Sequence, residues 1–508
     1  MSKPILTFRR RWLLCTISGF LLAGKWLGQL MDPETRRLLF YGWVDFAVVM
    51  ALLFGFGLAV AGFLHPIARA SRGRSDRWLS PWFFFLAIQI VFNFSFTLWD
   101  RVLAHIPQWS QLLQVSIWAI GLALTAGGYA FSAMRGWATK GWRSLLVLSP
   151  ILIIVPVQLA AADKWQNADD NPSRLGSIAG NNRAPIVILL FDTVGYDAVC
   201  TPDGQVRAQL ANLAEFSKIA TVYHQAKSAG DCTGISLPSI MLQEEVGNAL
   251  FKTDATYWPS QNRPEIPLRV AAEFTNALPY RVKAEGGRSV YIGIYLPFKK
   301  MMPGAWDAAY VCSIYGAVLS PAESRWAASM WRHVLRYLRV SKDPISALAR
   351  QLDIHVAMEN DYWRATTQNI TTTAQAYIRS CLSPGDLLFV HCPIPHSPFV
   401  FAADGTPNPL PREDVVGGYE AQMEYADTVF GQWVDELKQA GQWEQAWVLM
   451  IADHANIHTR RGENWDYRLH VPLLVKAPGQ TNRIDCHDPF RLVDLHAIPG
   501  FPAAADSP

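Results

Sequence analysis

The chain has 508 residues, of which 50% are hydrophobic, 12% aromatic and 17% charged, and its formal net charge is +3. Charged residues make up about a quarter of an ordinary soluble chain, so this composition excludes a disordered or fibrous protein and argues against an ordinary cytosolic enzyme. The mean hydropathy of +0.09 is too low for a chain built from membrane spans throughout. We therefore expect one strongly apolar part and one part of ordinary composition.

The apolar part lies before Asp163, where five runs have the character of membrane spans. Each run is close to the roughly 20 residues that cross a bilayer core, and Trp side chains lie at several ends, as is usual at a membrane interface. Lys25 lies inside the first run, where its long side chain can reach the interface. The runs are Trp12 to Leu30, Trp43 to Leu64, Trp82 to Trp99, Leu112 to Met134, and Leu145 to Ala161. They predict a five-helix transmembrane bundle over residues 1–162.

Positive residues are divided unequally among the segments that connect these runs. The N-terminal segment and the second and fourth loops hold 11 Lys and Arg residues, whereas the first and third loops hold three. Because cytoplasmic loops carry the excess of positive residues, this division places the N-terminus in the cytoplasm. Five spans then place everything after Ala161 on the outer side of the membrane.

The outer part alternates between strand-like and helix-like patterns. Residues 163–183 are polar and predict a linker, and Pro185–Phe191 is a continuous apolar run typical of a parallel strand buried on both faces. Further strand-like runs are Val290–Leu296, Asp386–Val390, Trp447–Ile451 and Val471–Val475, and helical spacing occurs over Val206–Ala220 and Tyr419–Ala440. The alternation predicts an α/β domain over 184–508 with a parallel-rich central sheet, whose chemistry collects at the carboxyl ends of the strands.

Seven cysteines are distributed unevenly between the two parts. Cys15 lies in the first apolar run, and the outer part holds Cys200, Cys232, Cys312, Cys381, Cys392 and Cys486. An even number in an oxidising compartment permits up to three disulfides, while free buried thiols are the alternative.

Acidic and imidazole residues accompany the ends of the strand-like runs. Asp192 follows the first run, Asp453 and His454 follow the run at Trp447, and His470 directly precedes Val471. His391 and His396 follow the run that ends at Val390. Carboxylates and imidazoles held by a rigid sheet are suitable ligands for a divalent cation, so we expect a metal site here.

The segment Asp231–Met241 places small hydroxyl residues before an apolar, helix-like stretch. A helix N-terminus favours anions, and a Thr or Ser hydroxyl beside a metal can act as an alkoxide nucleophile for phosphoryl or sulfuryl transfer. A simple helix cap is the alternative interpretation.

From about Ala184 to Gly479 the sequence resembles the alkaline phosphatase/sulfatase superfamily. It is most similar to the membrane-anchored, sulfatase-like hydrolases and transferases, a group that includes the phosphoethanolamine transferases of the bacterial envelope. The resemblance is carried, in order, by Ile186–Asp197, Leu213–Ser228, Thr233–Met241, Tyr295–Phe298, His391–Phe399, Tyr425–Asp427, Val448–His454 and His470–Gly479. It implies an alkaline phosphatase-like fold for the outer domain and a multi-pass protein of the bacterial inner membrane whose catalytic domain is periplasmic or extracellular.

The resemblance also implies roles for single residues. Asp192, Asp453 and His454 would bind the principal metal, and the metal set is completed by His396 and His470, near a second metal or the substrate anion. His391 and His458 are further candidates for substrate binding. The histidine content favours zinc, with manganese or calcium as alternatives.

Two residues compete for the role of nucleophile. The transferases use a Thr five residues before a Pro, which matches Thr233 and Pro238, whereas sulfatases use a Cys or Ser two residues before it, which matches Ser236. We favour Thr233, because the Arg that sulfatases carry two positions after the Pro is Ile240 here. The paired Asp-Asp of sulfatases is likewise replaced by Asp192-Thr193.

We accordingly expect a metal-dependent transferase that moves a phospho-head group, such as phosphoethanolamine, through a covalent Thr233 intermediate. The donor would be a membrane lipid and the acceptor an envelope lipid or glycan, with no nucleic-acid partner. The alternatives are a sulfatase or phosphodiester hydrolase of the same superfamily, and a catalytically inactive envelope assembly protein on the same fold.

Overall fold

The computed structural model describes residues 182–251, 255–263, 265–312, 354–410, 414–456 and 465–501, together with isolated residues before 178 and at 330 and 334. Most residues of the predicted spans and of the predicted linker over 163–183 lie outside the described residues. Among the residues that are described, no helix combines the length and the apolar character needed to cross a membrane. The chain divides into two compact units, one made of Met1–Trp165 with Tyr315–Glu359 and the other of Gln166–Ile314 with Asn360–Pro508. The following account concerns the second unit.

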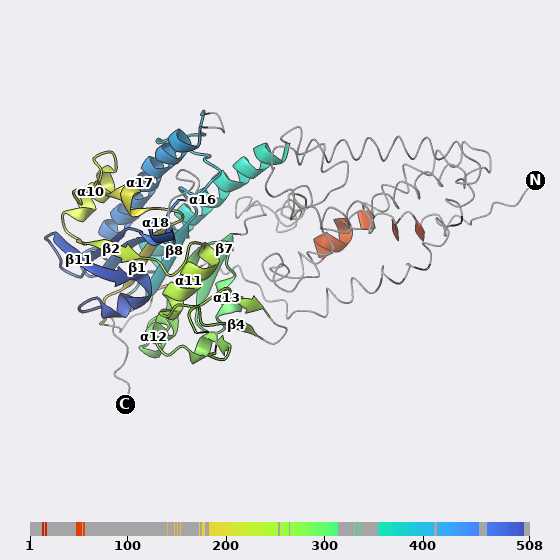
Figure 1. Cartoon of the computed structure of the whole chain (residues 1–508), viewed down its shortest axis with the longest axis horizontal. Coiled ribbons are helices and arrows are strands. Elements are labelled where there is room, and N and C mark those ends of the chain that lie inside the picture. Colours follow the sequence, from red (N-terminus) through yellow and green to blue (C-terminus); the bar gives the residue numbers. More distant parts are fainter. Residues whose placement is uncertain are drawn as a thin grey trace, which may run out of the picture. The chain divides into compact units, whose positions relative to one another are not determined.

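An eight-stranded sheet organises this unit, with the strand order β11-β2-β10-β9-β1-β8-β6-β7 (Figure 1). β1 lies between β9 and β8 and is parallel to both, while β10 runs antiparallel to its neighbours β9 and β2. The strands are β1 (Ile186–Phe191), β2 (Thr221–Lys227), β6 (Ser289–Ile294), β7 (Ala308–Cys312), β8 (Leu387–Cys392), β9 (Trp447–Ala452), β10 (Leu473–Lys476) and β11 (Ile484–Arg491). The predicted α/β domain with a parallel-rich sheet is confirmed.

Burial explains why the central strands are apolar along their whole length. Every residue of β1, β8 and β9 is buried, because helices cover both faces of the sheet. Figure 1 shows α10, α16 and α17 on one side of the strands and α11 and α12 on the other. The helices are α9 (Tyr196–Val199), α10 (Ala211–Ser217), α11 (Thr233–Leu242), α12 (Leu278–Ala284), α13 (Phe298–Met301), α16 (Ile354–Ser380), α17 (Val415–Gln439) and α18 (Trp465–Leu469), with 3-10 turns η3 (Ala271–Glu273) and η4 (Leu492–Ala497).

The amphipathic helix predicted over Tyr419–Ala440 is α17, which begins four residues earlier. Asp414 caps it by accepting a hydrogen bond from the Gly417 N–H at 2.9 Å. Its apolar face packs on the sheet through Trp433, whose ring lies 5.6 Å from that of Phe191 in β1. A small antiparallel sheet of β3 (Leu250–Phe251), β4 (Thr256–Trp258) and β5 (Arg269–Val270) completes the unit.

A buried ion pair joins two strands at the edge where they begin. Arg288 precedes β6 and Asp386 precedes β8, and the guanidinium donates to the carboxylate through Nη2 at 2.6 Å and Nε at 3.2 Å. Arg288 also donates to the Cys381 carbonyl at 2.7 Å, and the Tyr377 hydroxyl donates to Asp386 at 3.0 Å. Both charged groups are therefore hydrogen-bonded where water is excluded.

The six cysteines of the outer part are all free thiols in the structure. The alternative of free, largely buried thiols therefore holds for these six residues, and the three disulfides that their number permits are not formed. Four of them, Cys200, Cys312, Cys381 and Cys392, are buried in this unit.

Candidate active site

Three adjacent strands bring three metal-ligating side chains to one edge of the sheet. Phe191 at the end of β1 is in register with Ala452 of β9 and Cys392 of β8, so Asp192 and Asp453 emerge side by side. His391 is the fifth residue of β8, and its Nε2 lies 3.3 Å from Asp192 Oδ2. One ligand atom from each of Asp192, His391 and Asp453 lies within 4.8 Å of the other two, and all three residues are buried.

This group fits a divalent cation on its own chemistry. Asp192 Oδ1 is buried and has no hydrogen-bond partner within the described part of the chain, which is costly for a carboxylate oxygen. A cation would pair that oxygen and offset the repulsion between the two carboxylates. Hard oxygen donors beside an imidazole nitrogen are suitable ligands for a divalent cation, so Asp192, His391 and Asp453 would hold it.

The two carboxyl groups have different electrostatic surroundings. Burial, followed by repulsion from Asp192, raises the pKa of Asp453 above its ordinary value. Burial opposes ionisation of Asp192 as well, but His396, His391 and His454 together outweigh it and lower the pKa of Asp192. Two neighbouring acids whose pKa values move apart are typical of a site that handles protons or metal ions.

Asp453 is held by four contacts that fix both of its oxygens. Oδ1 accepts hydrogen bonds from the Thr193 N–H at 2.9 Å and from the His454 N–H at 2.8 Å. Oδ2 accepts from the Thr233 hydroxyl at 2.7 Å and lies 3.3 Å from His454 Nε2. His454 Nδ1 lies 3.1 Å from the Ala455 carbonyl, where it donates a hydrogen bond and leaves Nε2 facing the carboxylate. The predicted ligands Asp192, Asp453 and His454 thus lie together.

Thr233 is the first residue of α11, directly after the N-cap residue Cys232. The first N–H groups of a helix have no acceptor within the helix, so they form a favourable place for an anion. Thr233 therefore combines three features at one point: a hydroxyl, a helix N-terminus, and a hydrogen bond to a carboxylate of the candidate metal group.

Ser236 lies one turn further along the same helix and is fully buried. Its hydroxyl donates to the Gly230 carbonyl at 2.7 Å and accepts from the Ser228 hydroxyl at 3.0 Å. These two hydrogen bonds tie α11 to the loop that connects it with β2, so the Ser236 hydroxyl stabilises the fold at this point.

The remaining predicted residues take separate places. The imidazole of His396 stacks on Trp363 with ring centroids 5.6 Å apart, and its charge lowers the pKa of Asp192 after the larger opposing effect of burial. His470 donates from Nε2 to the His224 carbonyl at 2.9 Å, so that nitrogen is bound to strand β2. His391, predicted for substrate binding, lies instead among the candidate metal ligands. His458 lies outside the described residues.

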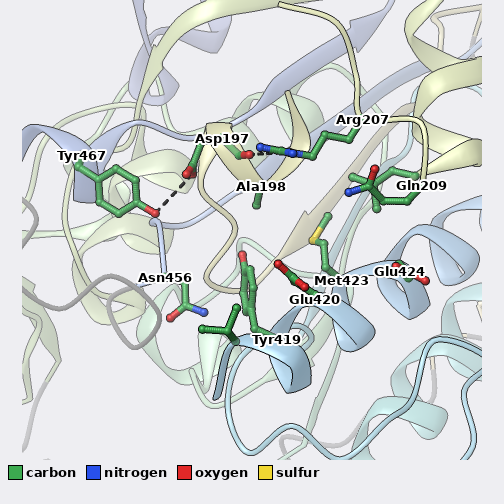
Figure 2. Close-up of a pocket in the computed structure, with 12 residues that line it drawn as sticks. Asp197, Ala198, Arg207, Gln209, Tyr419, Glu420, Met423, Glu424, Asn456 and Tyr467 are labelled. Carbon is green, nitrogen blue, oxygen red and sulfur yellow. Dashed lines mark hydrogen bonds between the residues drawn. The ribbon is translucent and has the colours of Figure 1, made fainter. Parts of the chain in front are cut away.

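A cavity of about 310 Å³ lies between residues of α9 and α17 (Figure 2). Its wall includes Asn456, two residues after His454, and Tyr419 of α17, whose hydroxyl donates to the Thr193 carbonyl at 3.1 Å. In another part of the wall, the Tyr467 hydroxyl donates a hydrogen bond to Asp197 at 3.4 Å. The other charged side chains that line the cavity are Arg207, Glu420 and Glu424. The cavity is large enough for a small organic group, but Asp192, His391, Asp453 and Thr233 are not among its lining residues.

Sequence reasoning missed Thr193 and Tyr419 as parts of this site. The special feature of Thr193 is its backbone conformation, which the residue type does not reveal. Tyr419 has no feature in the sequence that distinguishes it from the other residues of an amphipathic helix. The one available signal was the position of Thr193, directly after Asp192 at a strand end.

Comparison with known proteins gives the family. The family model for sulfatases matches residues 186–495, which is more than half of the chain. No curated protein sequence matches the chain.

The solved structures that match this chain include sulfatases and phosphonate hydrolases. The phosphonate monoester hydrolase of Agrobacterium radiobacter is 15% identical, with 62% of this chain and 72% of that chain covered and a TM-score of 0.38. A 2-O GAG sulfatase is 11% identical, with 61% and 68% covered and a TM-score of 0.40. The match to the family model establishes that this chain belongs to the sulfatase family, within the alkaline phosphatase/sulfatase superfamily.

Proposed function

We propose that this protein is a metal-dependent hydrolase that cleaves phosphate esters through a covalent intermediate on Thr233. The observation that carries the proposal is the 2.7 Å hydrogen bond from Thr233 Oγ1 to Asp453 Oδ2. It places a nucleophile at a helix N-terminus and against the buried Asp192, His391 and Asp453 group. The buried Ser236 hydroxyl, already bonded on two sides, supports Thr233 as the nucleophile.

Each residue has a defined task in this reaction. Asp453 Oδ2 holds the Thr233 proton as Oγ1 attacks phosphorus, and the bond from phosphorus to the ester oxygen breaks. Water then attacks the phosphothreonine, so ester and water become phosphate and alcohol, and Thr233 regains its proton. When bound, a divalent cation supplies positive charge that offsets the negative charge of the attacking and leaving oxygens. The free N–H groups at the start of α11, beside Thr233, favour the negatively charged phosphate.

The residues of the nucleophile segment, Thr233 to Met241, support phosphate rather than sulfate chemistry. Formylglycine sulfatases carry a Cys or Ser at the position of Ser236, whose hydroxyl is here buried and bonded to Gly230 and Ser228. Oxidation of Thr233 would give a ketone instead of an aldehyde. Ile240 also stands where the sulfatase pattern has an Arg.

The family match supports hydrolysis better than the transferase that the sequence predicted. We therefore propose water as the acceptor in place of an envelope lipid or glycan. Zinc stays the proposed cation, because His391 and His454 supply imidazole donors beside the two carboxylates. The membrane anchor over 1–162, with the catalytic domain outside the cytoplasm, also stays a proposal, supported by the five apolar runs and the unequal loop charges.

A labelling experiment on the full chain tests the nucleophile and the acceptor together. The protein is incubated with bis-p-nitrophenyl phosphate in water enriched in oxygen-18, quenched, digested and examined by mass spectrometry. We expect a nitrophenylphosphoryl adduct on Thr233 and oxygen-18 in the released nitrophenyl phosphate. Thr233→Val should abolish nitrophenol release, and the matched Ser236→Ala variant should retain it. An adduct on Ser236, or activity in Thr233→Val, would overturn the nucleophile. Absence of oxygen-18 from the product, together with transfer of the phosphoryl group to added lipid, would restore the transferase.

A further inference from the structure

The guanidinium of Arg468, in α18, lies beside the segment that leads into the nucleophile helix. Its Nη1 donates to Asp231 Oδ2 at 3.3 Å, and Asp231 stands two residues before Thr233. Consecutive Cα atoms are about 3.8 Å apart, so the Cα atoms of Asp231 and Thr233 are at most about 7.6 Å apart. The ion pair therefore lies close to the start of α11.

The main chain of Arg468 is bound to the other side of the site. Its carbonyl accepts a hydrogen bond from the Ala455 N–H at 2.9 Å, and Ala455 stands two residues after Asp453. The Thr233 hydroxyl in turn donates to Asp453 at 2.7 Å. A closed ring of contacts thus runs from Arg468 through Asp231 and Thr233 to Asp453, and returns through Ala455. Arg468 contacts the nucleophile segment with its side chain and the metal-ligating segment with its backbone.

The position of α18 is held by other contacts to the same segment. Lys227 Nζ donates to Asp466 Oδ1 at 2.5 Å, and the Ser228 N–H donates to the Leu469 carbonyl at 2.8 Å. These contacts join α18 to the end of β2 without the guanidinium. Attachment of the helix is therefore not a sufficient reason for a positive charge at Arg468.

Most of the hydrogen-bonding capacity of this guanidinium is unused. An arginine has five N–H donors, and within the described part of the chain only Nη1 of Arg468 has a hydrogen-bond acceptor. The side chain is 36% exposed, so a solute can reach it. The neighbouring helix α11 has no charged residue, because Ile240 stands where the sulfatase pattern has an Arg. Arg468 thus brings to the start of α11 a cation that the helix itself lacks.

We propose that Arg468 binds the anionic phosphate group of the substrate, and that Asp231 competes with the substrate for the same guanidinium. The inference rests on the proposed phosphate-ester hydrolysis and adds a residue that recognises the anion. Arginine is suited to this role because its planar fork binds two phosphate oxygens at once. Asp231 is close enough to repel the phosphate, since charges are screened only beyond about 8 Å at physiological ionic strength. The two members of one ion pair therefore have opposite effects on substrate affinity.

The test measures substrate binding by the full-length protein without turnover. Every protein carries Thr233→Val, which removes the nucleophile, and is titrated with bis-p-nitrophenyl phosphate by isothermal calorimetry in buffer that contains ZnCl2. The changes added to this parent are Arg468→Met, Asp231→Asn and, as the matched control, Lys227→Met. The control breaks the other ion pair of α18 and so separates loss of the guanidinium from loosening of the helix. Thermal melting shows that each variant is folded.

We expect Arg468→Met to bind the diester at least about tenfold more weakly than the parent, because a charge-assisted hydrogen bond is lost. Asp231→Asn should bind about threefold more tightly, and Lys227→Met within about twofold of the parent. Unchanged affinity in Arg468→Met, or a similar loss in both Arg468→Met and Asp231→Asn, would overturn the role of Arg468, and the second result would mean that the pair only positions the loop. Asp231→Asn also tests the pair if Arg468→Met does not fold. Absence of nitrophenol release by the wild-type protein would instead overturn the proposed hydrolysis itself.

Discussion

Asp453→Asn should make the cation-free protein more stable while removing its function. Asparagine preserves the geometry of all four contacts: its oxygen accepts from the Thr193 and His454 N–H groups, and its amide faces the Thr233 hydroxyl and His454 Nε2. The charge is lost, and the Thr233 hydroxyl becomes the acceptor of a hydrogen bond from the amide. Ligand oxygens of Asp192 and Asp453 lie within 4.8 Å, which at an effective dielectric constant near 20 corresponds to a repulsion of about 3 kcal/mol.

Part of that repulsion is already offset by His454, whose pKa is raised by Asp453 and Asp192 against the larger, opposing effect of burial. We therefore expect a net gain of about 2 kcal/mol in the free energy of unfolding, or roughly 5 °C in Tm, in EDTA. Asp453 has a raised pKa, so the folded state binds more protons than the unfolded state above the ordinary value of 3.8. Wild-type stability should then fall as pH rises from 3.8 through the raised pKa, and Asp453→Asn should remove that decline.

Differential scanning fluorimetry in EDTA at several pH values measures both effects. Asp427→Asn is the matched control, because Asp427 is also a buried carboxylate with a raised pKa but accepts three hydrogen bonds from Asn212 and Leu213. Its amide nitrogen would face those donors, so this variant should lose about 1–3 kcal/mol. A lower melting temperature for Asp453→Asn than for wild type would refute the reasoning that the two carboxylates repel in the folded protein.

Three further predictions concern other parts of the second unit. Arg288→Met should lower the free energy of unfolding by about 3–5 kcal/mol in urea denaturation, because Asp386 keeps its buried charge without a partner. Burial raises the pKa of the Cys392 thiol to about 12. Alkylation of Cys392 by iodoacetamide in the native protein should therefore be negligible at neutral pH, and its rate should rise about tenfold per pH unit. Rapid alkylation of the native protein, detected by peptide mass spectrometry, would contradict this. Tyr419→Phe should cost about 1 kcal/mol of stability, because the Thr193 carbonyl loses its donor; an unchanged Tm would show that water replaces the hydroxyl.

The sequence was sufficient to predict those parts of the site that follow from strand ends. Asp192, Asp453 and His454 were expected together because parallel strands end at one edge of a sheet, and the structure places them there. Thr233 was expected at a helix start for the same kind of local reason, and it begins α11.

The rest of the site depends on packing that a sequence pattern does not contain. An apolar run carries no direction, so nothing in Val471–Val475 indicated that β10 would be antiparallel to its neighbours. His391 lies inside an apolar strand, and only the register with β1 brings it beside Asp192. Thr193 owes its left-handed backbone to tertiary hydrogen bonds, which leave no trace in its residue type.

The central position of β1 has a consequence for how the protein is made. Its neighbours lie far downstream, since Ile186 pairs with Leu387 on one side and with Trp447 on the other. Closing such long loops is slow, and an apolar strand without both neighbours presents open edges to other chains. During synthesis from the N-terminus, β1 therefore stays unpaired until most of the chain has left the ribosome. An incomplete chain of this kind needs protection from aggregation. Because residue 453 directly follows β9, cation binding by residues 192, 391 and 453 would require that this last central strand has joined the sheet.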